Sequence, residues 1–246
     1  MTLPNALRRI APALALAVAL APALPAASAA EPAVFDVTLK GLRAATLRID
    51  GTEGDGRYAV TGRLESRGLA AMVRKVRFDA QASGAVAADG TLQPASFAEQ
   101  TDTGSRQSEA VIDYAGGVPQ VKVALPERKA RDYDVDPSTQ GGTVDPLTAL
   151  YATLRDVDAG RECNLSLRMF DGRRASALTL GAPEAKDGRV TCAGEYRRVA
   201  GFSPKDMAEK TRFPFRLTYA PGPDGRMQVV EVAMDTLYGS ARMERR

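Results

Sequence analysis

The chain is dominated by short runs in which apolar and polar residues alternate, separated by turn residues. In residues 34–39, for example, Phe35, Val37 and Leu39 alternate with polar neighbours. A period of two predicts half-buried antiparallel strands whose apolar side chains face a core. We expect such strands at residues 34–39, 46–50, 57–65, 76–82, 91–99, 106–114, 118–125, 163–170, 175–180, 189–199, 213–219, 227–234 and 237–243.

One segment has helical spacing instead. Asp145 can accept hydrogen bonds from exposed backbone N–H groups, and Pro146 suits the first position of a helix. The residues that follow predict an amphipathic helix that ends before residue 160. Residues 68–74 predict at most one further helical turn. The apolar face of the main helix consists of Leu147, Leu150, Tyr151 and Leu154.

Turn residues separate the predicted strands and bear on the number of domains. Asp171-Gly172 and Asp224-Gly225 are typical of hairpins, whereas the glycine-rich residues 51–56 predict a loop and residues 203–205 a turn. The longest predicted loop, residues 127–143, could also be a linker between domains. Because strands of the same style continue on both sides of it, we expect a single domain over residues 31–246.

Residues 1–30 have the order of a secretory signal peptide. Arg8 and Arg9 precede an apolar run rich in Ala, Leu and Val, and small residues follow at 26–30. Cleavage near Ala30 would leave a mature chain in the periplasm, and an uncleaved anchor is the alternative. We expect no transmembrane span in the mature chain, because no later segment is apolar enough to cross as a helix.

Composition excludes several classes of function. The 246 residues include no histidine, which rules out a Ser-His-Asp triad and every histidine-based metal or haem site. The formal charge is +3, and residues 31–246 carry only +1, so we expect no nucleic-acid partner. Nucleotide-binding glycine motifs are absent. We therefore predict no cofactor.

An acidic motif resembles the start of a calcium-binding loop but does not complete it. Asp132, Asp134 and Asp136 have the right spacing. The position that requires glycine is Pro137, and the position that requires a bidentate glutamate is Thr143. We therefore predict a solvated acidic loop and no metal site.

The only two cysteines are Cys163 and Cys192. An even number of cysteines in an exported chain favours a disulfide, whereas a reactive thiol is the alternative. Neither cysteine lies in a C-x-x-C motif or has a histidine to help it ionise. In the chain-entropy account, a bridge over this separation stabilises the fold by about 3–4 kcal/mol.

A series of landmarks runs along the mature chain: Gly41-Leu42, Tyr58, Gly68-Leu69, Gly90, Pro94, Phe97, Asp145-Pro146-Leu147, Leu150-Tyr151, Phe170-Asp171-Gly172-Arg173, Pro214 and Gly239. With these landmarks the mature chain resembles the DUF3108 family of exported bacterial proteins over most of residues 34–243. The resemblance implies a curved antiparallel sheet that forms an unclosed barrel, similar to lipoprotein carriers of the LolA and LolB type and to DUF1849 proteins, which have a disulfide. It implies no catalytic residue, because the family has no settled activity.

The expected fold is therefore mainly β, a single curved antiparallel sheet or unclosed β-barrel with one amphipathic helix, although the strand pattern alone also allows a sandwich. We expect a non-catalytic periplasmic cell-envelope protein that binds a lipid or other apolar ligand in the half-barrel. Leu147, Leu150, Tyr151 and Leu154 would line the site, or would simply complete the core. A module that recruits envelope proteins through strand edges is a second hypothesis. An envelope hydrolase is the third.

Overall fold

The computed structural model describes residues 32–73 and 75–246, so the predicted signal peptide lies outside the described residues. These residues form one 13-stranded antiparallel sheet, ordered β7-β6-β5-β4-β3-β2-β1-β13-β12-β11-β10-β9-β8. The strands are β1 Ala33–Leu39, β2 Leu42–Gly54, β3 Arg57–Ser66, β4 Arg77–Val86, β5 Leu92–Asp102, β6 Gln107–Ala115, β7 Val118–Leu125, β8 Ser166–Phe170, β9 Ala175–Lys186, β10 Arg189–Ala200, β11 Arg212–Pro221, β12 Met227–Thr236 and β13 Gly239–Arg245.

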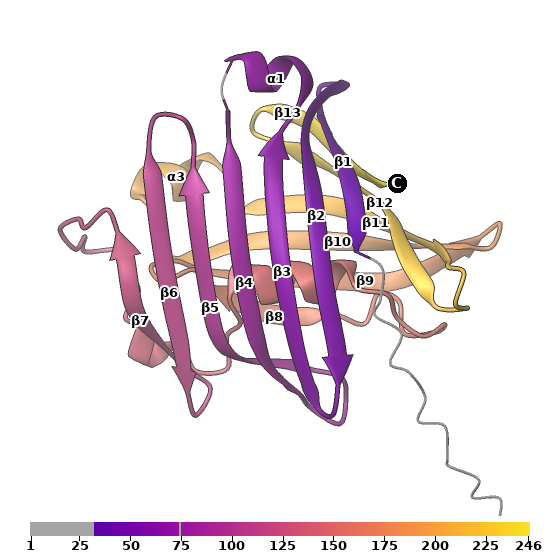
Figure 1. The fold of residues 1–246 in the computed structure, drawn as a ribbon, viewed down its shortest axis with the longest axis horizontal. Coiled ribbons are helices and arrows are strands. Elements are labelled where there is room, and N and C mark those ends of the chain that lie inside the picture. The colour runs from indigo at the N-terminus through magenta and orange to yellow at the C-terminus, as the bar shows by residue number, and fades with distance from the viewer. Residues whose placement is uncertain (1–31, 74) are drawn as a thin grey trace, which may run out of the picture.

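The sheet curls until its two halves face each other (Figure 1). The strands β1–β7 run up and down the view, and β8–β12 cross behind them. The first and last strands join the halves, since Phe35 of β1 pairs with Arg245 of β13. The predicted curved antiparallel sheet is confirmed. The sandwich alternative is wrong, because one continuous sheet contains all the strands.

The barrel remains unsealed between its edge strands, β7 and β8. The chain itself covers part of this seam. Val144 forms a parallel bridge with Met169 of β8, donating its N–H to the Arg168 carbonyl and accepting from the Phe170 N–H, each at 2.9 Å. On the other edge, the Gly142 N–H donates to the carbonyl of Gly117, just before β7, at 2.9 Å. The predicted loop 127–143 therefore spans the seam.

Helix α2, Pro146–Leu154, lies inside the curled sheet behind β3–β5 (Figure 1). Asp145 caps it as predicted, accepting the Thr148 N–H at 2.8 Å, and Pro146 takes the first helical position. Two shorter helices, α1 Gly68–Val73 and α3 Pro204–Glu209, and the 3-10 helix η1 Pro137–Thr139 lie in connections. No helix of the described residues is long and apolar enough to cross a membrane.

Three local predictions are wrong for identifiable reasons. Residues 51–56 are not a loop, because β2 continues to Gly54 and only Asp55 and Gly56 turn, both at positive φ. Residues 203–205 begin α3, where the Ser203 hydroxyl caps the helix by accepting the Asp206 N–H. The strand expected from residue 163 starts only at Ser166, after Cys163 adopts a φ of +62°.

Side chains alternate between the inner and outer faces of the sheet. One inward row crosses four strands as Val60, Ala82, Phe97 and Ile112, all buried and paired in register. This row and the apolar face of α2 belong to one hydrophobic core. Burial at about 25 cal/mol per Å² of apolar area makes this core the main stabilising contribution to the fold.

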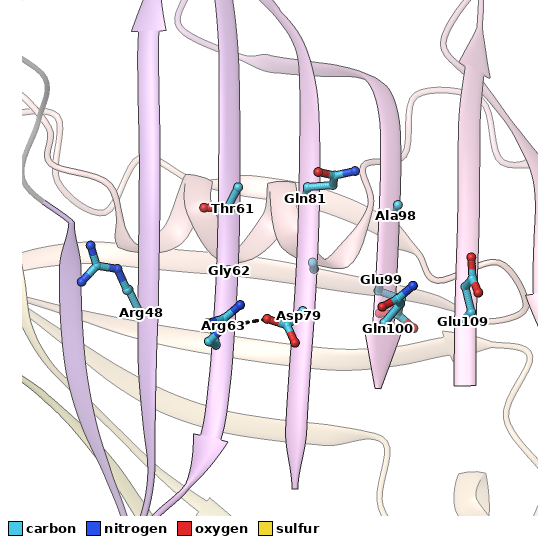
Figure 2. Close-up of a pocket in the computed structure, with 11 residues that line it drawn as sticks. Arg48, Thr61, Gly62, Arg63, Asp79, Gln81, Ala98, Glu99, Gln100 and Glu109 are labelled. Atoms are coloured by element: carbon cyan, nitrogen blue, oxygen red, sulfur yellow. Dashed lines mark hydrogen bonds and ion pairs between the residues drawn. The ribbon is translucent and has the colours of Figure 1, made fainter. Parts of the chain in front are cut away.

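The outer face of β2–β6 is polar and open to solvent (Figure 2). Arg48, Arg63, Asp79, Gln100 and Glu109 project from it on the side away from α2. The Arg63 Nε donates to Asp79 Oδ1 at 2.6 Å. An exposed ion pair of this kind adds at most about 1 kcal/mol to stability. The row lines an open, polar pocket of about 450 Å³ on the outer face of the sheet (Figure 2).

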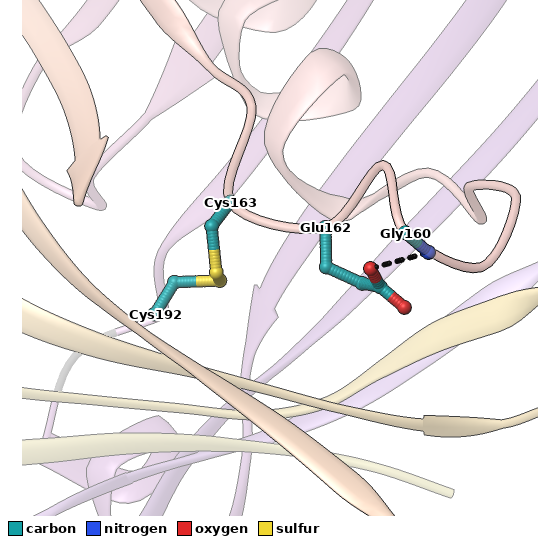
Figure 3. Close-up of a disulfide and its surroundings, with 4 residues drawn as sticks. All are labelled: Gly160, Glu162, Cys163 and Cys192. Carbon is teal, nitrogen blue, oxygen red and sulfur yellow. Dashed lines mark hydrogen bonds between the residues drawn. A yellow bond between two sulfur atoms is a disulfide. The ribbon is translucent and has the colours of Figure 1, made fainter. Parts of the chain in front are cut away.

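Cys163 and Cys192 form a disulfide with a Cα–Cα distance of 5.4 Å (Figure 3). The bridge ties the loop before β8 to the buried Cys192, the fourth residue of β10. Next to it, the Glu162 carboxylate accepts the Gly160 N–H at 2.8 Å and closes the loop. The disulfide therefore holds the loop that follows α2 against the second half of the sheet.

Candidate functional site

Helix α2 is seated on strand glycines. A Cβ atom on Gly62 of β3 would lie 2.6 Å from Leu147 Cδ1, and one on Gly51 of β2 would lie 2.3 Å from the Tyr151 ring. Both distances are shorter than van der Waals contact, so any larger residue would displace the helix. The glycines in these strands therefore permit the close approach of α2 to the sheet.

This seating places the predicted ligand-binding residues in the core. Leu147, Tyr151 and Leu154 are buried, and the half-buried Leu150 packs against the same core. The Tyr151 ring stacks on Tyr58, with centroids 6.3 Å apart. A ligand-binding role for these four residues stays a prediction, while their packing role is directly visible.

A buried polar network fixes the N-terminus of α2. Asp145 is fully buried and accepts from both the N–H and the hydroxyl of Thr148, at 2.8 and 2.6 Å. The Thr148 hydroxyl is also within 2.8 Å of the Tyr58 hydroxyl. Burial raises the pKa of Asp145 to about 6, because the carboxylate is removed from water. These contacts hold the helix in one orientation relative to β3.

At its other end, α2 is tied to β2 and to the β4–β5 turn. The Tyr151 hydroxyl and Arg155 Nη1 both donate to Glu53 Oε1, at 2.9 and 2.8 Å. Arg155 Nη2 also donates to the Gly90 carbonyl at 2.7 Å. This end of the helix is therefore held close to the β4–β5 turn.

A cavity of about 360 Å³ lies beside the helix face that carries Thr148 and Ala152. The β4–β5 turn, the loop after α2, and strands β8, β9 and β11 complete its wall. Tyr219 contributes from β11, and burial raises the pKa of its hydroxyl to about 12. The main apolar lining comes from Leu92, Val144, Ala152, Leu165, Leu167 and Leu180.

Two arginines border the same cavity. Arg155 is neutralised by Glu53, whereas the Arg161 guanidinium donates a hydrogen bond only to the Asp89 carbonyl, at 3.1 Å. The charge of Arg161 also contributes to lowering the pKa of the Asp89 carboxyl. Arg161 has no ion pair among the described residues. The cavity thus combines an apolar wall with a guanidinium that is available to an anion.

A second cavity, of about 410 Å³, lies at the seam near α3 and contains five arginines. Arg128 is paired in a bidentate manner with Asp134, at 2.6 and 2.8 Å. Burial and the neighbouring Arg128 lower the pKa of Arg173. Four carboxylates also line this cavity, so its charges are nearly balanced. Its cationic members are Arg106, Arg128, Arg131, Arg173 and Arg174.

The acidic motif of the predicted loop does not form a carboxylate cluster. Asp134 is held by Arg128 and by the Arg131 N–H, and Asp136 caps η1 by accepting the Ser138 N–H. Within residues 32–73 and 75–246, no three Asp, Glu, Cys or His side chains lie close enough to hold a metal.

Glu99 is an inward-facing acid that the sequence analysis did not single out. It lies on β5 two residues after the buried Phe97, and hence on the same face of the strand. Burial, with the negative charges of Asp171 and Asp145, raises its pKa to about 7. The alternation of residues along this strand could have predicted it. Residues two apart in a strand share a face, so Glu99 points to the same side as the apolar Phe97.

A comparison with family models identifies the family. The family model described as "Protein of unknown function (DUF3108)" matches residues 34–246. The chain belongs to the DUF3108 family. The resemblance drawn from the sequence landmarks is thereby confirmed.

Among the solved structures similar to this DUF3108 chain is one with a barrel-like fold. It is the crystal structure of a beta-barrel-like protein of the domain of unknown function DUF1849 from Brucella abortus. The match has 15% sequence identity and a TM-score of 0.47, and covers 87% of this chain and 94% of the other. No curated protein sequence matches the chain.

Proposed function

We propose that this DUF3108 protein is a non-catalytic, ligand-binding barrel of the cell envelope. Its ligand is an amphiphile with an apolar chain and an anionic group, such as a fatty acid. The cavity beside Ala152, whose wall is partly apolar and partly polar and which Arg161 borders, is the observation that carries the proposal.

The cavity has the dimensions and lining of a small-ligand site. Its volume of about 360 Å³ falls in the range of about 300–1,000 Å³ typical of such sites. Burying an alkyl chain against Leu165, Leu167 and Leu180 would be favourable at about 25 cal/mol per Å². A carboxylate at the border would accept hydrogen bonds from Arg161.

The cavity wall is held rigidly before any ligand binds. Helix α2 is fixed at one end by Asp145 and Thr148 and at the other by Glu53, and the disulfide ties down the loop that follows it. A preformed wall reduces the ordering cost of binding. We therefore assign the ligand to the side of α2 that carries Thr148 and Ala152. This side is next to the apolar face of α2 that the sequence pattern predicted as the ligand site.

Export to the periplasm is part of the proposal. The N-terminal residues 1–30 have the order of a signal peptide, and a disulfide persists in an oxidising compartment. The alternative of partner recruitment through free strand edges has less support. The exposed side of β8 is already occupied by Val144, and Gly142 reaches over toward β7.

The direct test is binding of cis-parinaric acid, a fluorescent long-chain fatty acid, to purified and delipidated protein. Ala152→Phe places a ring in the cavity and should weaken binding by at least about tenfold, because the ring occupies the volume of the chain. Ala59→Phe, on the exposed outer face of β3, is the matched control and should bind as the wild type does.

The charge is tested separately. Arg161→Gln should weaken binding of the fatty acid by about tenfold but leave binding of the corresponding fatty alcohol unchanged, since only the acid pairs with the guanidinium. Circular dichroism and thermal melts establish that each variant is folded. A folded wild-type protein that binds neither compound would refute the proposed function, as would Ala152→Phe with undiminished affinity.

A further inference from the structure

Large apolar side chains are exposed mainly at one rim of the barrel. Of the six large hydrophobic residues exposed in the described part of the chain, four lie in or directly beside three connections between strands. Met72 of α1 is 83% exposed and Tyr238 of the β12–β13 turn is 75% exposed. Leu42, where β2 begins, and Leu237 complete the group, which we call the apolar rim.

Sheet topology brings the three connections together. In the order β4-β3-β2-β1-β13-β12, the connections β3–β4, β1–β2 and β12–β13 all fall at the same end of neighbouring antiparallel strands. The Lys40 N–H donates to the Ser240 carbonyl at 2.8 Å, and the Arg67 N–H donates to the Ala44 carbonyl at 2.8 Å. Figure 1 shows α1 and the β12–β13 connection near each other at the top of the view.

The opposite ends of the strands are built differently. Their tight turns carry aspartate and glycine and none of the exposed large apolar side chains. Polar turns of this kind are typical of solvent-exposed β-hairpins. The contrast indicates that the apolar rim does not follow from turn chemistry alone. The turns of the opposite end are Asp55-Gly56, Asp89-Gly90, Gly116-Gly117, Asp187-Gly188 and Asp224-Gly225.

The apolar rim is also basic. Residues 40–43, 67–77 and 236–239 include six lysines or arginines and no acidic residue. Arg43, Arg67 and Arg77 pair with acids on the flanking strands. Lys40 and Lys75 are exposed or near the surface and have no ion pair among the described residues. Positive charge therefore surrounds the exposed apolar tips.

We propose that the apolar rim docks on an anionic lipid surface. Met72, Leu42 and Leu237 insert among the acyl chains, and the Tyr238 ring lies at the level of the headgroups, where amphipathic aromatic rings are favoured. Lysines beside the insertion point attract anionic headgroups. The four apolar side chains project from three separate connections and do not form a flat surface. Separate projecting side chains can insert into a fluid bilayer, whereas a protein partner would need a surface shaped to match them. The inference is independent of the ligand cavity.

Vesicle flotation tests the docking, with the full chain and with residues 31–246 in parallel. The wild type should float with vesicles of equal phosphatidylcholine and phosphatidylglycerol, and salt should weaken that binding. Met72→Ser/Tyr238→Ser should reduce vesicle partitioning by about tenfold or more, because two apolar insertions are lost. Val199→Ser, which alters an exposed apolar residue outside the rim, is the control and should bind normally.

A second pair of variants isolates the charge. Lys40→Gln/Lys75→Gln should weaken binding to the anionic vesicles by about tenfold and flatten its salt dependence. Arg57→Gln/Arg189→Gln, at the opposite end of the strands, should have no such effect. Thermal melts show whether each variant is folded.

Three results would overturn the proposal. The wild type could fail to float with anionic vesicles, or folded Met72→Ser/Tyr238→Ser could bind as well as Val199→Ser. Alternatively, a stoichiometric protein companion could depend on Met72 and Tyr238 while vesicle binding is absent. That last result would identify the rim as a protein-docking surface.

Discussion

Replacing Glu99 by glutamine should remove a pH-dependent destabilisation of the barrel. Burial raises the pKa of this carboxyl from its ordinary value of 4.5 to about 7. Below pH 4.5 the group is protonated in both the folded and unfolded states and has no effect. As the pH rises, the unfolded chain ionises first, so stability falls until about pH 7 and then levels off.

The size of the effect follows from the two pKa values. Their separation corresponds to at most about 3 kcal/mol, at about 1.4 kcal/mol for each tenfold change in proton affinity. Because the Glu99 side chain is partly exposed, screening by solvent reduces the expected loss between pH 5 and pH 8 to about 1–2 kcal/mol. Glu99→Gln should be more stable than the wild type at pH 8 by this amount and nearly equal to it at pH 5.

The assay is urea unfolding at pH 5, 6, 7 and 8. Buried Asp145, whose pKa is raised to about 6, adds a slope of the same sign in both proteins. Because Asp145 and Glu99 repel each other when both are ionised, the difference between the two proteins also contains this coupling. Glu109→Gln, on the outer side of the neighbouring strand β6, is the control. If the stability difference between Glu99→Gln and wild type does not change with pH, the assignment of Glu99 as a partly buried, inward-facing acid is wrong.

Three further predictions concern the framework of the barrel. Edman sequencing of exported protein should begin within a residue or two of Ala30, and recovery of the full-length chain would contradict cleavage. Cys163→Ser should cost about 2–4 kcal/mol in urea unfolding, with little added by removing the second cysteine, while two free thiols in peptide maps of native protein would argue against the bridge. Gly51→Ala should cost about 1–3 kcal/mol because its Cβ meets the Tyr151 ring. Gly54→Ala, whose Cβ would meet no atom within 4 Å, should change stability by less than about 0.5 kcal/mol. Equal effects of the two glycine variants would disprove the seating of α2.

The sequence by itself determined the local elements, because local elements depend on local chemistry. Alternation predicted the strands, and Asp145-Pro146 predicted the start of α2. It also identified the family through landmarks spread along the chain. The local pattern gave a wrong prediction at Gly51. This glycine lies within strand β2, where it allows α2 to pack closely against the sheet, and is not part of a loop.

Only the tertiary structure decided which strands are neighbours and what they enclose. A period of two says which side chains share a face but not which strand lies alongside, because backbone hydrogen bonds pair any two strands. The pairing of β1 with β13 joins segments from nearly opposite ends of the chain and makes the two halves one sheet, with the seam between β7 and β8 left open. That pairing brings Leu42, Met72 and Tyr238 to one rim. The same pairing places Glu99 inside and opens the cavity beside Ala152, because both depend on how far the sheet curls around α2.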